Sequence, residues 1–356
     1  MKAEDRQGPI RPQGSAGGSH GAGTAGGAGS ASRRRMLAAL ALPPLAAGAL
    51  AACADSTEAV RRGGPAGDTA TVRPVRTTLG DWTGVSDALG RTGDMKQGFM
   101  YHTGFPRRDL TVVSHGVVVK PALALASHVA FVRYADGNVL LMGDVAVTEG
   151  ELQGYLDALN AHGIEQTAIH KHLLSQTPDI WWIHVHAHGG DPVAIARGLR
   201  AAFDRTGTPP PASPGPPSRS PDLDTAGIDA ALGVKGSFDG EIYKSTFIRR
   251  ETILDDHMVL PPGLGSTTAL NFQPLGRGRA AVSGDCAMTA QEVRPALAAL
   301  RKGGAQLVEL HNHGLRDDPR LFFVHFWAVG DAVALARGFS PAVHTTNVRP
   351  FTPPTV

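Results

Sequence analysis

The chain has 356 residues, a length that predicts two domains or one internally duplicated unit. Hydrophobic residues make up 42% and charged residues 19%, which excludes a collagen and supplies ample material for a core. The net charge of +2, without a basic stripe interleaved with aromatic residues, predicts no nucleic-acid partner. The two cysteines, Cys53 and Cys286, cannot build a disulfide framework.

The first fifty residues have the pattern of an export signal. A Gly-, Ala- and Ser-rich stretch, residues 1–31, precedes Ser32-Arg33-Arg34-Arg35 and the 17-residue apolar run Met36–Ala52. A basic segment, an apolar segment and small residues at the exit make up a secretory signal, and an arginine pair beside serine is similar to a twin-arginine signal. Leu50-Ala51-Ala52-Cys53 resembles a bacterial lipobox, so we expect lipidation of Cys53.

The alternative to cleavage is a short anchor helix that stays in the protein. Pro43-Pro44 lies in the middle of the apolar run and would break such a helix. We therefore predict an exported protein with a lipid anchor in the membrane. It would lie on the outer side of the cytoplasmic membrane, in the periplasm or at the outer membrane.

Composition divides the rest of the chain. Residues 1–52 form the signal region, and residues 53–83 are interpreted as a tether between the lipid and the folded part. Residues 205–226 contain seven prolines, which predicts an extended, semi-rigid linker. The linker separates residues 84–204 from residues 227–346.

These two segments are copies of each other. An offset of 141 residues brings Gly143-Asp144 onto Gly284-Asp285, and places histidine on histidine at three further positions. The aligned histidines are His170 with His311, His172 with His313, and His184 with His325. Such agreement at a single offset indicates an internal duplication.

Each copy is predicted to be α+β, with a largely antiparallel sheet and two helices. Thr148 with Glu151, and Thr289 with Glu292, have the spacing of capping boxes before helices. Asp191 and Asp331 are expected to begin the closing helices. Upstream, alternating β-branched residues in 110–119 and 129–147 predict strands.

The histidines are the candidate site. Eight of the 15 lie in residues 170–188 and 311–325, which span less than a tenth of the chain. Each window reads as a β-hairpin, and side chains two apart on a strand share a face. In the first copy the shared faces carry the larger set, His170, His172, His184, His186 and His188.

If the two hairpin strands pair symmetrically, these faces coincide. Three imidazoles from neighbouring strands can then hold a divalent transition metal, zinc or copper, and leave a position for water. We predict such a site at His170, His172 and His184, with His186 or His188 as a further ligand or on the access route. The second copy offers His311, His313 and His325, while Trp327 and Val329 replace the other two.

The alternative is that the histidines are structural, hydrogen-bonding residues of the sheet. His115 and His257 fall in predicted turns, where solvated side chains are typical. Asp144 and Asp285 each follow a glycine and are interpreted as turn residues. Cys286 is expected to be a small core thiol.

Several runs resemble the LppY/LpqO-type lipoproteins over residues 84–346. They are Ile164–His172, Val308–His313, Phe322–Asp331 with its first-copy equivalent, and Arg108–Val112 leading to Pro121–Leu125. The chain differs in having Lys171 where Asn is common, and in the additional His186 and His188. The resemblance implies an exported, duplicated lipoprotein and implies no reaction.

Three classes of function stay open, so the sequence does not decide whether the protein is an enzyme. The first is a metal-binding lipoprotein, and the second a metal-dependent hydrolase with three histidines and a water. The third is a metal-free envelope module that binds a protein or glycan. The expected partner, apart from the membrane, is a small molecule or envelope component. A general base near the metal would distinguish the first two.

Overall fold

The computed structural model describes residues 70–212 and 222–351, which all belong to one compact unit, Pro65–Val356. The signal region, Cys53 and most of the proposed tether lie outside the described residues. The described part contains two six-strand sheets of equivalent order, one in each repeat, and two small three-strand sheets. Strand β19 adds to the second large sheet, and all paired strands are antiparallel. The α+β fold, largely antiparallel and repeated, is confirmed.

The first repeat has the strand order β1-β2-β5-β6-β9-β7. Its large-sheet strands are β1 (Asp94–Lys96), β2 (Met100–Pro106), β5 (Ala126–Arg133), β6 (Val139–Thr148), β7 (Glu165–His170) and β9 (Ile180–Gly189). The small sheet consists of β3 (Val112–Ser114), β4 (Val117–Val119) and β8 (Gln176–Thr177). Its helices are η1 (Leu79–Trp82), α1 (Thr83–Leu89), η2 (Pro121–Leu125), α2 (Glu149–Ala161) and α3 (Pro192–Phe203).

The second repeat has the order β10-β11-β14-β15-β18-β16. The strands are β10 (Ser237–Asp239), β11 (Ile242–Arg249), β14 (Thr267–Gly276), β15 (Arg279–Met288), β16 (Gln306–His311), β18 (Phe322–Asp331) and β19 (Val348–Pro350). The other small sheet has β12 (Leu254–Asp255), β13 (Met258–Val259) and β17 (Asp317–Asp318). The helices are α4 (Thr225–Leu232), α5 (Ala290–Lys302) and α6 (Ala332–His344).

The helices begin where the sequence predicts. The Thr148 amide donates to Glu151 at 2.7 Å, and the Thr289 amide donates to Glu292 at the same distance. Asp191 accepts from two amides at the start of α3, and Asp331 accepts from one at the start of α6. Each repeat also has a short helix, α1 or α4, that packs on the closing helix and was not predicted.

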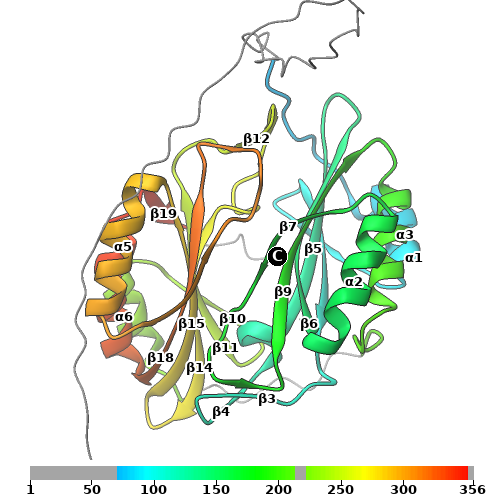
Figure 1. Cartoon of the computed structure of the whole chain (residues 1–356). Coiled ribbons are helices and arrows are strands. Elements are labelled where there is room, and N and C mark those ends of the chain that lie inside the picture. The colour runs from blue at the N-terminus through cyan, green and yellow to red at the C-terminus, as the bar shows by residue number, and fades with distance from the viewer. Residues whose placement is uncertain (1–69, 213–221, 352–356) are drawn as a thin grey trace, which may run out of the picture. The chain divides into compact units, whose positions relative to one another are not determined.

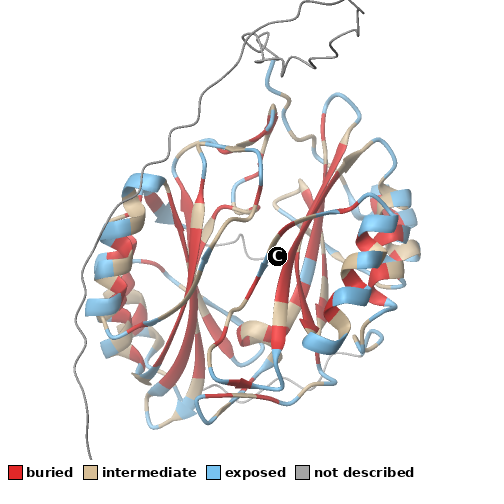
Figure 2. Cartoon of the chain, in the orientation of Figure 1, coloured by how far each residue is buried: buried red, intermediate tan, exposed pale blue. Residues whose placement is uncertain are grey.

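Each sheet buries one face under its own helices (Figure 1). In the first repeat Ile183 and Val185 of β9 pack with Leu152 and Tyr155 of α2. In the second, Val324 and Phe326 of β18 occupy the equivalent core. Figure 2 shows the buried residues along the central strands and the inner sides of the helices. The predicted apolar face of each hairpin is confirmed.

The opposite sheet faces contribute to contacts between the repeats. Two buried clusters mix residues of both copies: one contains Met142 and Phe323, and the other contains Trp182 and Trp327. Because β-strand side chains alternate, His184 between Ile183 and Val185 faces away from the helices and toward the other repeat. The alternation that places apolar side chains against the helices therefore places the histidines at the boundary between the copies.

An arginine network joins strand to helix in each repeat. Arg107, with a fully buried side chain, contacts Asp109 and Glu151 at 2.8 Å each, and it also donates to the carbonyl of Ala146. Arg249 makes the same contacts with Glu251 and Glu292, at 2.6 Å each, and with the carbonyl of Ala287. The carboxylates that cap α2 and α5 are thus neutralised by a buried guanidinium.

The described residues of the two proposed connecting segments contact the repeats. Val72 bridges Met258, and Trp82 is buried against the first repeat. At the start of the proposed linker, the Gly207 amide donates to Glu151, and Arg91 donates to the carbonyl of Pro209.

Candidate functional site

Six histidines and two aspartates meet between the repeats. We call them the central cluster: His170, His172, His184 and Asp144 from the first repeat, and His311, His313, His325 and Asp285 from the second. The histidines come from the ends of β7 and β16, from the residues that follow them, and from the middle of β9 and β18. The structure therefore brings together the histidine sets that the sequence assigns to separate hairpins.

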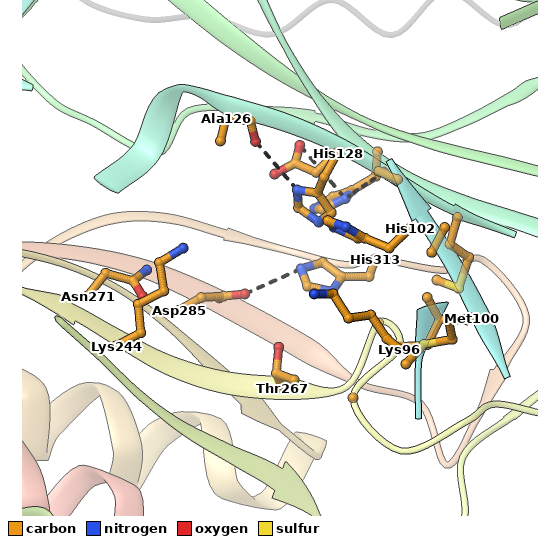
Figure 3. Close-up of a pocket in the computed structure, with 18 of the residues that line it drawn as sticks. Lys96, Met100, His102, Ala126, His128, Lys244, Thr267, Asn271, Asp285 and His313 are labelled. Carbon is orange, nitrogen blue, oxygen red and sulfur yellow. Dashed lines mark hydrogen bonds and ion pairs between the residues drawn. The ribbon is translucent and has the colours of Figure 1, made fainter. Parts of the chain in front are cut away.

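Asp144 and Asp285 are not turn residues, and that interpretation is wrong. Asp144 lies inside β6, paired with His128 on one side and His184 on the other. Its carboxylate is 3.1 Å from His172 Nε2. The Asp285 carboxylate is 3.4 Å from His313 Nε2, a contact that Figure 3 shows. Sequence analysis missed both as site residues, although their position beside a repeated glycine was a signal.

The glycine before each aspartate is explained by close strand packing. A Cβ on Gly284 would lie 2.0 Å from the Phe326 ring, and one on Gly143 would lie 2.6 Å from the carbonyl oxygen of His128. Both positions need a side chain of minimal size inside a strand.

Contacts cross from one repeat to the other throughout the cluster. The rings of His172 and His325 have centroids 3.8 Å apart, and those of His184 and His313 are 4.1 Å apart. Asn312 donates to the carbonyl of Thr167 at 2.9 Å, close to these rings.

The imidazoles could hold a metal ion in several groupings. Three sets of side chains have ligand atoms that all lie within 4.8 Å of one another: His170–His172–His325, His170–His184–His311 and Asp285–His311–His325. The first two sets take ligands from both repeats. The residues His170, His172 and His184, which the sequence groups in one triad, are thus distributed between two sets that each include a histidine of the second repeat.

Burial keeps five of the six imidazoles neutral. It lowers the pKa of His184, His311 and His313 to about 3, and lowers the pKa of His170 and His325 well below the ordinary value. Neighbouring imidazoles add to the effect in each case. The neutral ring is the form that binds a metal.

The two carboxyls differ in charge. Burial raises the pKa of Asp285 to about 7, with the charge on Asp144 adding to the rise. Burial also tends to raise the pKa of Asp144. The effect of the neighbouring His184 and His172 is larger, so the pKa of Asp144 is lowered overall. Near neutral pH the pair therefore has one firmly ionised carboxylate and one that exchanges a proton.

Many ligand atoms of the cluster have no hydrogen-bond partner among the described residues. They include Nε2 of His184, His311, His313 and His325, Nδ1 of His170, and Oδ1 of Asp144 and Asp285. A buried polar atom without a partner is costly, and a bound cation would satisfy several at once. The donor set fits a transition metal.

Six residues of the central cluster, all except His170 and His311, line a cavity of about 510 Å³. Polar and charged residues that also line it include Lys96, His102, His128, Lys244 and Asn271 (Figure 3). The cavity could admit a small molecule next to Asp144 and Asp285.

His186 and His188 lie in a different group. Their Nε2 atoms both lie 2.8 Å from Oδ2 of Asp255, which belongs to the second repeat. Sequence analysis missed Asp255, because the matching position in the first repeat is Ser114 and the duplication gives no signal there.

The remaining candidates are placed as follows. His115 and His257 lie in the turns β3–β4 and β12–β13, as predicted. Cys286 is a buried free thiol in the core of the second repeat, also as predicted. Across residues 70–212 and 222–351, no helix combines the length and the hydropathy needed to cross a bilayer.

A search with the sequence found no match among curated proteins. Solved structures with weak similarity include two microcompartment shell proteins. A double-ringed trimeric shell protein of the RMM microcompartment has 15% identity and a TM-score of 0.17, with 58% of this chain and 81% of that chain covered. EtuB from Clostridium kluyveri has 11% identity and a TM-score of 0.18, with coverage of 71% and 89%. The trimeric shell protein PduB has 11% identity and a TM-score of 0.16, with coverage of 69% and 86%.

One family model matches the chain twice, at residues 83–205 and 226–345. Its two matches coincide with the two repeats and cover most of the chain. The chain therefore belongs to the family described as Domain of Unknown Function (DUF1259).

Proposed function

We propose that this protein is an exported, lipid-anchored protein that binds a divalent transition-metal ion, zinc or copper, between its two repeats. One observation carries the proposal: buried, neutral imidazoles from both repeats converge with ligand atoms within 4.8 Å, and many of those atoms lack a hydrogen-bond partner. A structural role for the histidines does not account for so many unsatisfied atoms in one place.

The export part of the proposal rests on the sequence. The twin-arginine-like pattern, the lipobox at Leu50–Cys53 and the resemblance to LppY/LpqO-type lipoproteins support a lipid anchor in the membrane. The partners proposed are that membrane and a small molecule or envelope component, and no nucleic acid.

Imidazole ligands suit zinc, copper and nickel alike, so the ligand type alone does not select the ion. Zinc and copper are proposed because three neutral imidazoles with an open position form a common site for both. Trp182 and Phe323 stack on His172 and His313 at 4.4 and 3.4 Å between ring centroids, and hold these two rings in place.

The test is the metal content of the protein purified without a histidine tag. The double variant His170→Ala, His311→Ala interrupts all three sets of the central cluster. We expect zinc or copper in the native protein and loss of that metal from the double variant. His162→Ala, which removes an exposed histidine, is the matched control and keeps the metal. Equal metal content in the double variant and the control would favour the metal-free binding module.

A metal-dependent hydrolase is the second candidate, favoured by the carboxyls in the cluster. Asp285, with a pKa raised to about 7 by burial, lines the cavity beside His313 and is suited to accept a proton from a metal-bound water. The test is turnover of p-nitrophenyl acetate and p-nitrophenyl phosphate by the zinc-loaded protein. Asp285→Asn should abolish turnover while the set His170–His184–His311, which does not include Asp285, keeps its metal. Absence of turnover in the loaded native protein would leave metal binding as the function.

A further inference from the structure

His186, His188 and Asp255 form a compact group outside the central cluster. The two Nε2 atoms lie 2.8 Å from the same carboxylate oxygen, and the rings have centroids 4.6 Å apart. The side chains of His186 and Asp255 are each 3% exposed, and that of His188 is 25% exposed. Two ligand types thus meet at one point, where one repeat supplies the imidazoles and the other the carboxylate.

These short contacts do not satisfy the hydrogen-bonding capacity of the three atoms. Nε2 of His186, Nε2 of His188 and Oδ2 of Asp255 are buried and have no hydrogen bond of acceptable geometry among the described residues. Burying three polar atoms in this state costs free energy. A cation between them would accept a lone pair from each.

The fold does not require this group. At the offset of 141 residues, Trp327 and Val329 stand in place of His186 and His188, and Ser114 in place of Asp255. The neighbouring ladders match at that offset, since Asp255 pairs with Asp317 and Ser114 with Gln176. Trp327 is buried with apolar neighbours, so the same fold accommodates an uncharged side chain at the position equivalent to His186. The polar group therefore occurs at only one of the two sets of positions that the duplication makes equivalent.

We propose that His186, His188 and Asp255 form a second metal site, which takes a divalent first-row transition ion in octahedral coordination. With metal–ligand distances of about 2.0–2.2 Å, ligands 2.8 Å apart subtend about 80–90° at the ion, the angle between neighbouring positions of an octahedron. Two histidines and one carboxylate are a ligand set typical of Fe(II) and leave positions for exchangeable ligands.

Access to the site is through His188. This residue lines a surface hollow of about 400 Å³ together with Asn138, His257 and Arg316. Arg316 pairs with Glu165 at 2.7 Å, and a Glu165 oxygen lies 3.8 Å from Nδ1 of His186. The Glu165 carboxylate therefore lies behind the His186 ring, at a distance longer than a hydrogen bond.

The test is a Co(II) titration of the metal-free full-length protein, followed by visible absorption and by the number of equivalents bound. Octahedral Co(II) absorbs weakly, whereas Co(II) with fewer ligands absorbs strongly, so the two sites have different signals. We expect Asp255→Asn and His188→Ala each to lose one equivalent and the weak signal. Asp256→Asn, an exposed neighbour of Asp255, is the control and loses neither.

The outcomes separate this site from the central cluster. If Asp255→Asn binds as many equivalents of Co(II) as the native protein, the second site does not exist. If Asp255→Asn fails to fold, the same comparison is made with His188→Ala. An equivalent that survives in His170→Ala, His311→Ala and is lost on adding His188→Ala supports the second site, whatever the central cluster binds. If the native protein binds only one equivalent and the variant His170→Ala, His311→Ala binds none, the second site is overturned and the proposed function stays intact.

Discussion

The imidazole rings of His170 and His311 stack with centroids 4.1 Å apart and planes inclined by 14°, although the residues belong to different repeats. Each ring also stacks on a β9 or β18 histidine of its own repeat, His184 or His325, at 4.6 Å. The pair therefore lies where the two copies of the site meet, and two of the three ligand sets take residues from both copies. This relationship governs how the protein should respond to acid and to mutation.

Acid should destabilise the metal-free protein. A histidine whose pKa is lowered by folding stabilises the protein above the unfolded value of about 6.5, and that stability is lost as pH falls toward the folded value. Five histidines of the central cluster act in this direction, with folded pKa values of about 3 for His184, His311 and His313. Asp285, with its raised pKa, acts in the opposite direction as one group.

The balance of five groups against one predicts a steep loss of the free energy of unfolding between about pH 6.5 and pH 4. Urea unfolding in the presence of a chelator at several pH values measures it. His184→Gln removes one titrating ring and should make the slope shallower. A free energy of unfolding that stays constant across this range would contradict the burial of neutral histidines.

Removing the buried guanidinium of either repeat should be strongly destabilising. Arg249→Ala leaves Glu251 and Glu292 without their shared partner, at a cost of about 3–5 kcal/mol. Arg249→Lys should recover only part of that, because an ammonium cannot make both paired contacts. Chemical denaturation measures the loss, and Arg200→Ala, which breaks an exposed pair with Asp204, should cost less than about 1 kcal/mol. Equal effects of Arg249→Ala and Arg200→Ala would refute the role of the network.

A methyl group at Gly284 should disturb the site beside it. Gly284→Ala places a Cβ inside the Phe326 ring, so the strands must separate at a cost of about 1–3 kcal/mol. Asp285 follows directly and should move with the backbone, which lowers metal retention. Gly150→Ala is the matched control, because no atom lies within 4 Å of the added methyl group and helix α2 should gain stability. An unchanged urea midpoint for Gly284→Ala would show that the packing is more tolerant than the distances imply.

Lipidation can be tested by fractionation. Cys53→Ser removes the acceptor of the lipid, so the protein should move from the membrane to the soluble fraction. Cys286→Ser is the control, since that thiol is buried in the core of the second repeat and carries no lipid. Membrane attachment that persists in Cys53→Ser, with detergent needed for release, would exclude the lipobox.

The fold was largely predictable because its signals are local. The capping boxes at Thr148 and Thr289 and the alternation along residues 180–188 each depend on neighbours in the sequence. The candidate site was predictable only in part. Alternation assigns His184 to a face of its sheet, but it carries no information about what covers that face, so the contact with His313 had no sequence signal.

Asp144 shows a second limit of sequence reasoning. A glycine followed by aspartate is typical of turns, yet here the glycine makes room for neighbouring strands and the aspartate lies inside β6. Steric demands from strands that are distant in the sequence decide that position. Asp255 lies on a two-residue strand whose partner β17 follows about sixty residues later, so nothing near it predicts its meeting with His186.

The pairing of His186 with Asp255, where the sister positions hold Trp327 and Ser114, has a consequence for how the duplication can be used. Two identical subunits related by a twofold axis would have to carry such a group twice or not at all. Joining the copies in one polypeptide removes that constraint, because each half can accept substitutions that its twin does not. The covalent link thus permits two equivalent positions of a duplicated fold to differ, so that one carries a polar group and the other an apolar one.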